Sequence, residues 1–282
     1  MWNELCNSMS VFESIIYGIV SGLAEFLPIS SQGHQAIMLR LFGLETRDPV
    51  QDLMIHIAVF LSLVFSCRGM LARLRREQMI LSRSRRKRNY DFNGTYDLRL
   101  IKTAVFPMLI GLIVYRKMAH FEFQPLFMAL FFFINGIILV IPEYMRQGNK
   151  TGRSMSGFDG ILLGLFSAFS CVPGISRTGS CMAIASLRGA DRNYNLNWML
   201  LLSIPAMLFW IIFDIIQIFS LGSLSMGFPH LLIYLSGAVF AFAGGYIGIS
   251  SVKYIVVKSG FSGFAYYSWG AAMFMLVLYL IT

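Results

Sequence analysis

Two short stretches of this 282-residue chain carry the residues best suited to chemistry. The first contains Glu25, Ser31 and His34, which offer a carboxylate, a hydroxyl and an imidazole close together in the sequence. The second centres on Arg177, whose forked guanidinium matches the oxygens of a phosphate or a carboxylate. Together these groups are typical of a site that binds an anion and moves a proton.

The residue types leave the role of each group open. Glu25 could hold a divalent cation, act as a base, or pair with Arg177 as a structural ion pair. Ser31 is a candidate nucleophile, although capping of a helix would also explain a serine there. His34 fits proton transfer or phosphate binding, and it also fits a hydrogen-bonded polar residue at a helix start.

Three further polar residues, Asp52, His56 and Asp214, lie elsewhere in the apolar parts of the chain. Asp52 and His56 are four residues apart, so on a helix they share one face and could form a hydrogen-bonded pair, for which a structural role is favoured. Asp214 falls near the end of an apolar run and is expected at the membrane interface.

The two chemical stretches belong to an internal repeat. Ser14–Ala36 recurs 146 residues later as Gly160–Met182 without a gap. Each copy is an apolar run that is broken near its end, at Pro28–Ser31 and at Pro173–Ser176. Duplicated, broken hydrophobic segments indicate a polar binding site inside a membrane protein.

A new helix is expected after each break, with Ser30 or Ser31 and Ser176 as N-caps. Free N–H groups and the positive ends of the two helix dipoles would then point into one cavity. The residues expected to contact a bound anion there are Ser30, Gln32, Gly33, Gly174, Ser176, Thr178 and Gly179.

Composition excludes a soluble protein. Only 13% of the residues are charged and 56% are hydrophobic, whereas about 25% are charged in soluble domains. A membrane-spanning helix needs roughly 20 apolar residues. Uncharged runs of that length occur at Phe123–Pro142, Asn193–Phe213 and Ser259–Thr282. Pairs of glycines four residues apart, Gly18 with Gly22 and Gly244 with Gly248, predict close helix packing.

Charge predicts the topology. Eleven Lys and Arg residues lie between Arg68 and Lys102, and in so hydrophobic a chain they indicate a cytoplasmic loop rather than a nucleic-acid partner. The chain then divides into halves 1–145 and 146–282, with re-entrant hairpins at about 11–44 and 158–190 that enter from opposite faces. We therefore predict an all-α polytopic membrane protein with an inverted-topology repeat. About six spans are expected, at 53–67, 103–115, 123–141, 193–213, 230–250 and 263–281.

The segments 22–34 and 173–179 resemble the undecaprenyl pyrophosphate phosphatase family of the bacitracin-resistance type. The resemblance covers nearly the whole chain and implies an interdigitated inverted repeat. It also implies an activity, dependent on Mg²⁺ or Ca²⁺, that removes one phosphate from undecaprenyl pyrophosphate and so recycles the lipid carrier for cell-wall synthesis.

The resemblance implies a role for each group at the breaks. Arg177 would clamp the pyrophosphate, Glu25 would support the metal or the attacking group, His34 would transfer a proton, and Ser31 stands at the position proposed as nucleophile. Asp52 and His56 also resemble a family segment, as possible supporting residues.

This chain departs from the family pattern at the first acidic position, where it has Ser21. Gln32 and Cys181 stand where the family commonly has threonine. Loss of one carboxylate weakens a metal site, because hard cations favour several oxygen ligands.

The leading hypothesis is therefore a phosphatase of a polyprenyl pyrophosphate lipid, in the bacterial cytoplasmic membrane, with its site open to the outer face. One alternative is a transporter or flippase of a polyprenyl phosphate lipid. Another is a relative that binds the lipid but has lost hydrolysis. A homo-oligomer is compatible with each.

Overall fold

The computed structural model describes residues 9–83, 93–114, 121, 123–146, 148–169, 172–221 and 228–281. The described part is built of α-helices joined by turns, which confirms the predicted all-α class. The helices are α2 (Val11–Phe26), α3 (Ser31–Leu41), α4 (Pro49–Arg83), α5 (Asn93–Val114), α6 (Pro125–Tyr144), α7 (Gly157–Ala168), α8 (Arg177–Leu187), α9 (Arg192–Leu221), α10 (Phe228–Ser259) and α11 (Ser262–Ile281).

Five of these helices, α4, α6, α9, α10 and α11, are long and apolar enough to cross a membrane. The chain is therefore a multi-pass membrane protein. The sixth predicted span lies on α5, whose first ten residues include Asp97, Arg99 and Lys102. Because these three charged residues fall in its apolar stretch, α5 is not among the five helices, and a sixth span stays a prediction.

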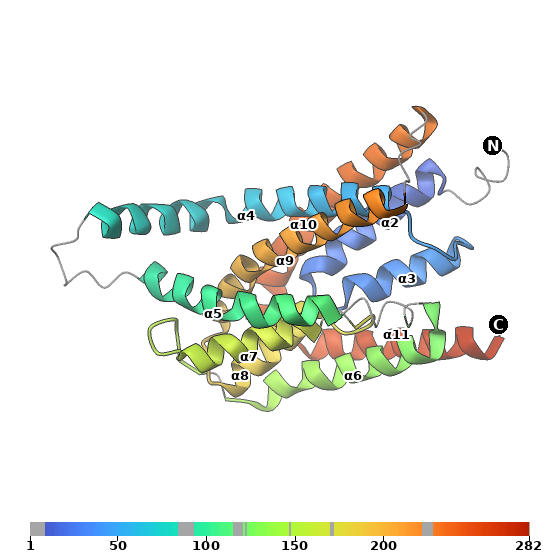
Figure 1. Ribbon diagram of the computed structural model, residues 1–282. Helices are drawn as coiled ribbons and strands as arrows, with labels where there is room; N and C mark the ends of the chain where they lie inside the picture. The colour runs from blue at the N-terminus through green and yellow to red at the C-terminus, as the bar shows by residue number, and fades with distance from the viewer. Residues whose placement is uncertain are drawn as a thin grey trace.

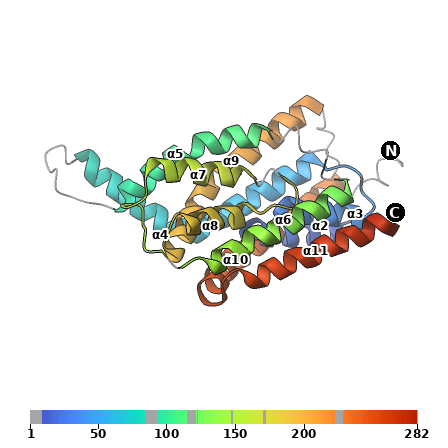
Figure 2. The same cartoon turned by 90° about the horizontal axis from the view of Figure 1, so that it is seen from below.

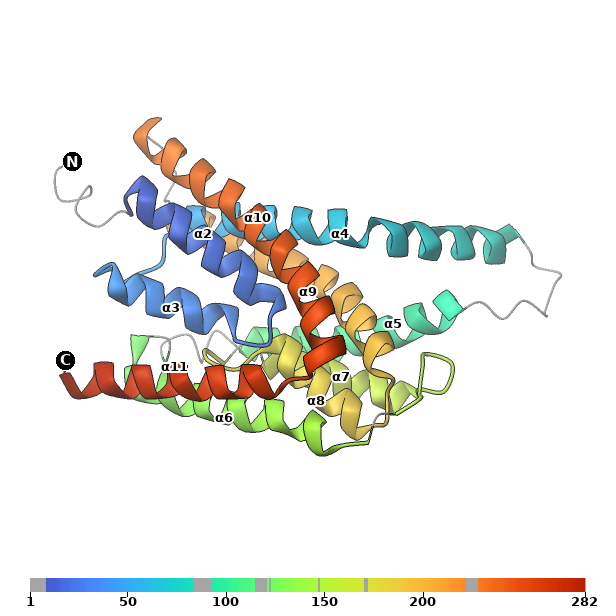
Figure 3. The same cartoon turned by 180° about the vertical axis from the view of Figure 1, so that it is seen from behind.

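The two broken segments approach the centre of the molecule from opposite ends (Figures 1 and 3). The hairpin of α2 and α3 enters from the end at which α11 finishes. The hairpin of α7 and α8 enters from the end at which α4 finishes and α5 begins. This arrangement is the inverted repeat that the sequence predicts.

Local sequence explains why the two hairpins begin and end alike. Ser10 forms a capping box with Glu13 before α2, and Ser156 forms one with Asp159 before α7, at the same offset of 146 residues. After α3 and α8 the chain turns at Gly43 (φ 72°) and Gly189 (φ 75°), also 146 residues apart. Glycine is favoured at these positive φ angles because it has no Cβ.

The two halves interlock rather than stand side by side. Helix α2 of the first half packs along α10 of the second, whereas α7 of the second packs along α5 of the first. Gly18 and Gly22 let the backbone of α2 touch that of α10, and Gly164 does the same for α7 against α5. The close packing expected at the first glycine pair is thereby confirmed. From below, α6 and α11 run together along one face (Figure 2).

One boundary differs from expectation. The sequence predicts that the first helix of the second hairpin covers 158–172, whereas α7 ends at Ala168 and the N–H of Val172 bonds to the carbonyl of Phe169. The most basic part of the predicted cytoplasmic loop, 84–92, lies outside the described residues.

Candidate functional site at the junction of the two broken helices

The two breaks touch at the centre of the molecule. A Cβ atom built on Gly33 would lie 3.0 Å from the backbone nitrogen of Gly174, so the hairpins meet backbone to backbone. The N–H of Gly174 donates to the hydroxyl of Ser30 at 3.0 Å. Gly174 has φ 102° and Ser30 has φ 71°, conformations that place both breaks in the left-handed region. The predicted meeting of the breaks is confirmed.

Asn135, on α6, holds the two breaks together. Its amide oxygen accepts from the N–H of Ser176 at 2.9 Å, and its amide nitrogen donates to the carbonyl of Pro28 and to the hydroxyl of Ser268. The residue is fully buried. Irregular backbone at membrane depth needs such partners, because water cannot supply them. Asn135 was not among the residues predicted from the sequence, although an asparagine within the uncharged run 123–142 is a signal that could have revealed it.

Arg177 is the first residue of α8 and lies in the interior, with 6% of its side chain exposed. Its Nη2 lies 2.9 Å from Oε1 of Glu25, which is near the end of α2. The remaining guanidinium nitrogens, Nε and Nη1, have no hydrogen-bond partner in the described part of the protein, and the contact with Glu25 is an ion pair without hydrogen-bond geometry. The guanidinium therefore keeps donors for a further anion.

A small cavity of about 20 Å³ lies around this ion pair. That volume holds about one water molecule. Helices α3 and α8 both begin at this cavity, so the positive ends of two helix dipoles adjoin it. Its walls are formed by Ala24, Glu25, Ser31, Gln32, Ile175, Ser176, Arg177 and Trp210.

The predicted anion-binding residues divide into three groups. Gln32 and Ser176 line the cavity, whereas Ser30, Gly33 and Gly174 build the junction of the breaks. Two further predicted residues, Thr178 and Gly179, are buried in the first turn of α8 and do not line the cavity.

His34 does not join Glu25 and Arg177 in this cavity. Its Nδ1 is 2.8 Å from the carbonyl of Ser30, and its Nε2 is 2.7 Å from the hydroxyl of Tyr267. The ring lines a different pocket of about 590 Å³, which is mostly apolar and lies among α2, α3, α10 and α11. Ala24 lines both spaces, so the apolar pocket adjoins the polar cavity.

The expected pairing of Asp52 with His56 is wrong. Asp52 accepts from the hydroxyl of Tyr17 at 3.0 Å and from Nη1 of Arg47 at 3.3 Å. His56 instead contacts Asp214, with 2.6 Å between Nδ1 and Oδ2. Asp214 is 3% exposed and therefore faces the interior of the protein. Spacing along one helix could not reveal partners on α2 and α9.

The residues present do not fit a metal site made by the protein alone. Glu25 is the one carboxylate among the described residues that line the cavity, and Arg177 already pairs with it. No three His, Cys, Asp or Glu side chains of the described ranges come together as a metal-binding group. Ser21, one turn before Glu25, is buried with an unpartnered hydroxyl and supplies no carboxylate.

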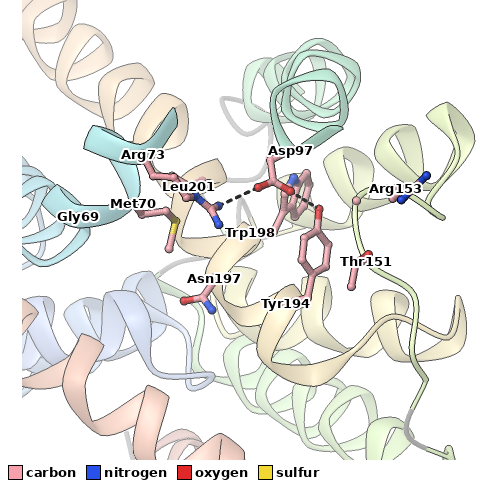
Figure 4. Close-up of a pocket in the computed structure, with 11 residues that line it drawn as sticks. Gly69, Met70, Arg73, Asp97, Thr151, Arg153, Tyr194, Asn197, Trp198 and Leu201 are labelled. Carbon is pink, nitrogen blue, oxygen red and sulfur yellow. Dashed lines mark hydrogen bonds and ion pairs between the residues drawn. The ribbon is translucent and has the colours of Figure 1, made fainter. Parts of the chain in front are cut away.

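A separate pocket of about 400 Å³ lies toward the far end of α4, among α4, α5, α9 and the segment before α7 (Figure 4). Asp97 accepts there from Nη2 of Arg73 and from the hydroxyl of Tyr194. This pocket contains none of the residues predicted for the site.

Fold and site together define a class of polytopic, all-α membrane proteins with two interlocked inverted hairpins and a buried arginine where the hairpins meet. The family model described as bacitracin resistance protein BacA matches residues 14–274. The chain belongs to this family.

Curated relatives span the chain almost end to end. One from Alkaliphilus metalliredigens is 27% identical over 97% of this chain and 100% of its own length. One from Methanococcus vannielii is 28% identical over 94% of this chain and 98% of its own. One from Treponema denticola is 31% identical over 92% of this chain and 94% of its own. All three are named undecaprenyl-diphosphatase.

Proposed function

We propose that this protein is an integral membrane phosphatase that hydrolyses undecaprenyl diphosphate to undecaprenyl phosphate and inorganic phosphate. The observation that carries the proposal is the buried Arg177, which pairs with Glu25 where two helices begin. Membership of the family and the name shared by its relatives support the substrate.

The side chains at the cavity are suited to phosphoryl transfer, which depends chiefly on positioning and on stabilisation of negative charge. Arg177 and the N–H groups at the starts of α3 and α8 would bind the phosphoryl oxygens as charge develops on them. The hydroxyl of Ser31, or a water beside it, would attack the terminal phosphorus. The bond from that phosphorus to the bridging oxygen breaks, and undecaprenyl phosphate leaves with the electron pair. If water attacks, inorganic phosphate forms directly; if Ser31 attacks, a water then cleaves the phosphoserine ester and releases inorganic phosphate.

The apolar pocket beside the cavity suits the substrate's hydrocarbon tail. The pocket adjoins the cavity at Ala24, so the hydrocarbon tail of a lipid whose diphosphate is bound in the cavity would lie directly in apolar surroundings. The cavity itself has room for about one water, so the diphosphate can enter only after α3 and α8 separate slightly.

For location, we propose the cytoplasmic membrane of a bacterium, with the site reached from the outer face. The support is the basic character of 68–102, which favours a cytoplasmic position for the C-terminal end of α4 and the N-terminal end of α5. The hairpin with Glu25 and Ser31 then enters from outside.

Phosphate release from undecaprenyl diphosphate by the purified full chain tests the function. Arg177→Ala is expected to lower kcat by about 10²–10³-fold, the usual loss when one preorganised charge-stabilising group is removed. Arg75→Ala, which removes an exposed arginine of α4, is the matched control and should retain activity. A wild-type protein that releases no phosphate, or an Arg177→Ala variant as active as the control, would overturn the proposal.

The inverted repeat also favours a second candidate, a carrier that moves a polyprenyl phosphate across the bilayer. The protein in sealed vesicles separates the two. Carriage predicts movement of labelled lipid without cleavage, whereas hydrolysis predicts phosphate release without net movement.

A further inference from the structure

A basic pocket lies between α4 and α10, two helices that pack along each other. Its volume is about 240 Å³. None of the residues that line it lines the cavity at Arg177. Its walls include Phe65, Ser66 and Arg68 of α4 and Tyr246, Ser250 and Lys253 of α10.

Two positive charges line this pocket without a negative partner. Neither Arg68 nor Lys253 forms an ion pair with another described residue, and none of the described residues in the pocket wall is acidic. The guanidinium of Arg68 lies over the ring of Phe65, 4.8 Å from its centroid, a contact that leaves the N–H donors free to bind an oxygen. A pocket lined by charges of one sign attracts an ion of the opposite sign, so this pocket is suited to an anion.

Exposed aromatic side chains lead from the pocket into the apolar part of both helices. Phe65 contacts Tyr246 with 6.0 Å between ring centroids and Phe242 with 6.4 Å. All three rings are exposed, as is Leu61 one turn before Phe65. On helices that span a membrane, such an exposed apolar strip faces the hydrocarbon tails of lipids.

The order of residues along the two helices places the pocket at a membrane boundary. α4 has no Lys or Arg before Arg68, and α10 has none before Lys253. Both helices therefore change from apolar to basic at this pocket, and aromatic residues are enriched where a span leaves the hydrocarbon. A phospholipid has the same order, with apolar chains followed by a charged phosphate.

We propose that this pocket binds the phosphate of one anionic phospholipid of the surrounding bilayer. Arg68 and Lys253 bind the phosphate oxygens from two sides, and the acyl chains lie along the strip of Leu61, Phe65, Phe242 and Tyr246. Basic pockets between spanning helices at the cytoplasmic surface are suited to anionic headgroups, which are abundant in that leaflet. The bound lipid bridges α4 and α10, and the site is independent of the phosphatase chemistry.

Native mass spectrometry of the purified full chain with equal amounts of phosphatidylglycerol and phosphatidylcholine tests the proposal. The wild type should retain one phosphatidylglycerol in preference to phosphatidylcholine. Arg68→Gln combined with Lys253→Gln should weaken this retention about 20-fold, because each basic residue near a membrane surface contributes about fivefold in affinity.

Arg75→Gln combined with Arg76→Gln is the matched control. It removes the same charge from exposed positions of α4 outside the pocket and should retain the lipid as the wild type does. Equal losses in the two double variants would indicate diffuse attraction to the basic end of α4 and would overturn the proposal. Equal retention of the two lipids by the wild type, or retention of a polyprenyl phosphate in place of phosphatidylglycerol, would overturn it as well.

Photo-crosslinking of the wild-type protein covers the case of a variant that fails to fold. Phosphatidylglycerol with a photoreactive headgroup should label the peptides that contain 65–68 and 246–253. Labelling confined to other peptides contradicts the proposed site.

Discussion

Arg177 can serve as the centre of the site because its guanidinium donors are not used up within the described structure. Glu25 contacts one guanidinium nitrogen, and the others have no hydrogen-bond partner within the described structure. A guanidinium whose donors were all bonded within the protein would have a structural role. A guanidinium with donors to spare, at the starts of two helices, is suited to bind the oxygens of an anion.

At the same scale, Ser21 offers a test of the metal dependence that the family resemblance implies. Ser21 and Glu25 are one helical turn apart on α2, and the hydroxyl of Ser21 is buried without a partner. Ser21→Glu would place a second carboxylate beside the first. We expect phosphate release to be kept or raised and its response to added Mg²⁺ or Ca²⁺ to increase, measured against chelator-treated protein.

Ser21→Gln is the matched control, since it has the size of glutamate without the charge. An equal metal response in the Glu and Gln variants, or loss of activity in the Glu variant alone, would contradict the expectation.

At the scale of elements, a single side chain of α6 stabilises the unwound segments. Asn135 bonds to the carbonyl of Pro28 in one break and to the N–H of Ser176 in the other. An amide fits because it donates and accepts at once. The positions of Arg177 and Glu25 relative to each other depend on this link.

Asn135→Leu is therefore expected to destabilise the protein by about 1–3 kcal/mol, because the N–H of Ser176 is left buried and unpaired. A lower unfolding midpoint in detergent should accompany a loss of phosphate release. Asn197→Leu, at an exposed position on α9, serves as the control and should leave both unchanged. Equal midpoints for the two variants would refute this role of Asn135.

At the scale of the whole molecule, each hairpin of the site packs against a helix of the other half. α2 packs on α10 and α7 on α5, so neither hairpin is supported by its own half alone. A membrane interior gives little hydrophobic drive for helix association, and close backbone contact at glycines takes its place. Gly18 and Gly164 make that contact at equivalent places in the two hairpins.

The opposed hairpins predict the sidedness of two loops. Thr46, between α3 and α4, and Ser154, before α7, are exposed. The segment that joins α3 to α4 and the segment before α7 lie at opposite ends of the molecule (Figure 1). With the native cysteines replaced by serine, Thr46→Cys should react with a membrane-impermeant maleimide on intact cells. Ser154→Cys should react only after the membrane is opened. Labelling of both positions from one side would contradict the inverted repeat.

Much of the fold could be read from the sequence because its signals are local. The 146-residue offset, the proline and serine at each break and the apolar runs predicted both hairpins, and α2 with α3 and α7 with α8 form them. The ends of helices were predicted less accurately, as α7 demonstrates, because the last turn of a helix depends on the residues that pack beside it.

Sequence alone also determined that Arg177 and Glu25 would face one cavity, because each stands beside a break and the breaks meet by symmetry. Only tertiary structure decided which side chains lie next to them. His34 faces the apolar pocket, Asp214 rather than Asp52 pairs with His56, and Asn135 joins the breaks. The reason is physical: helical periodicity assigns a residue to a face, whereas its partner across that face comes from another helix, whose rotation and depth are set by packing over the whole molecule.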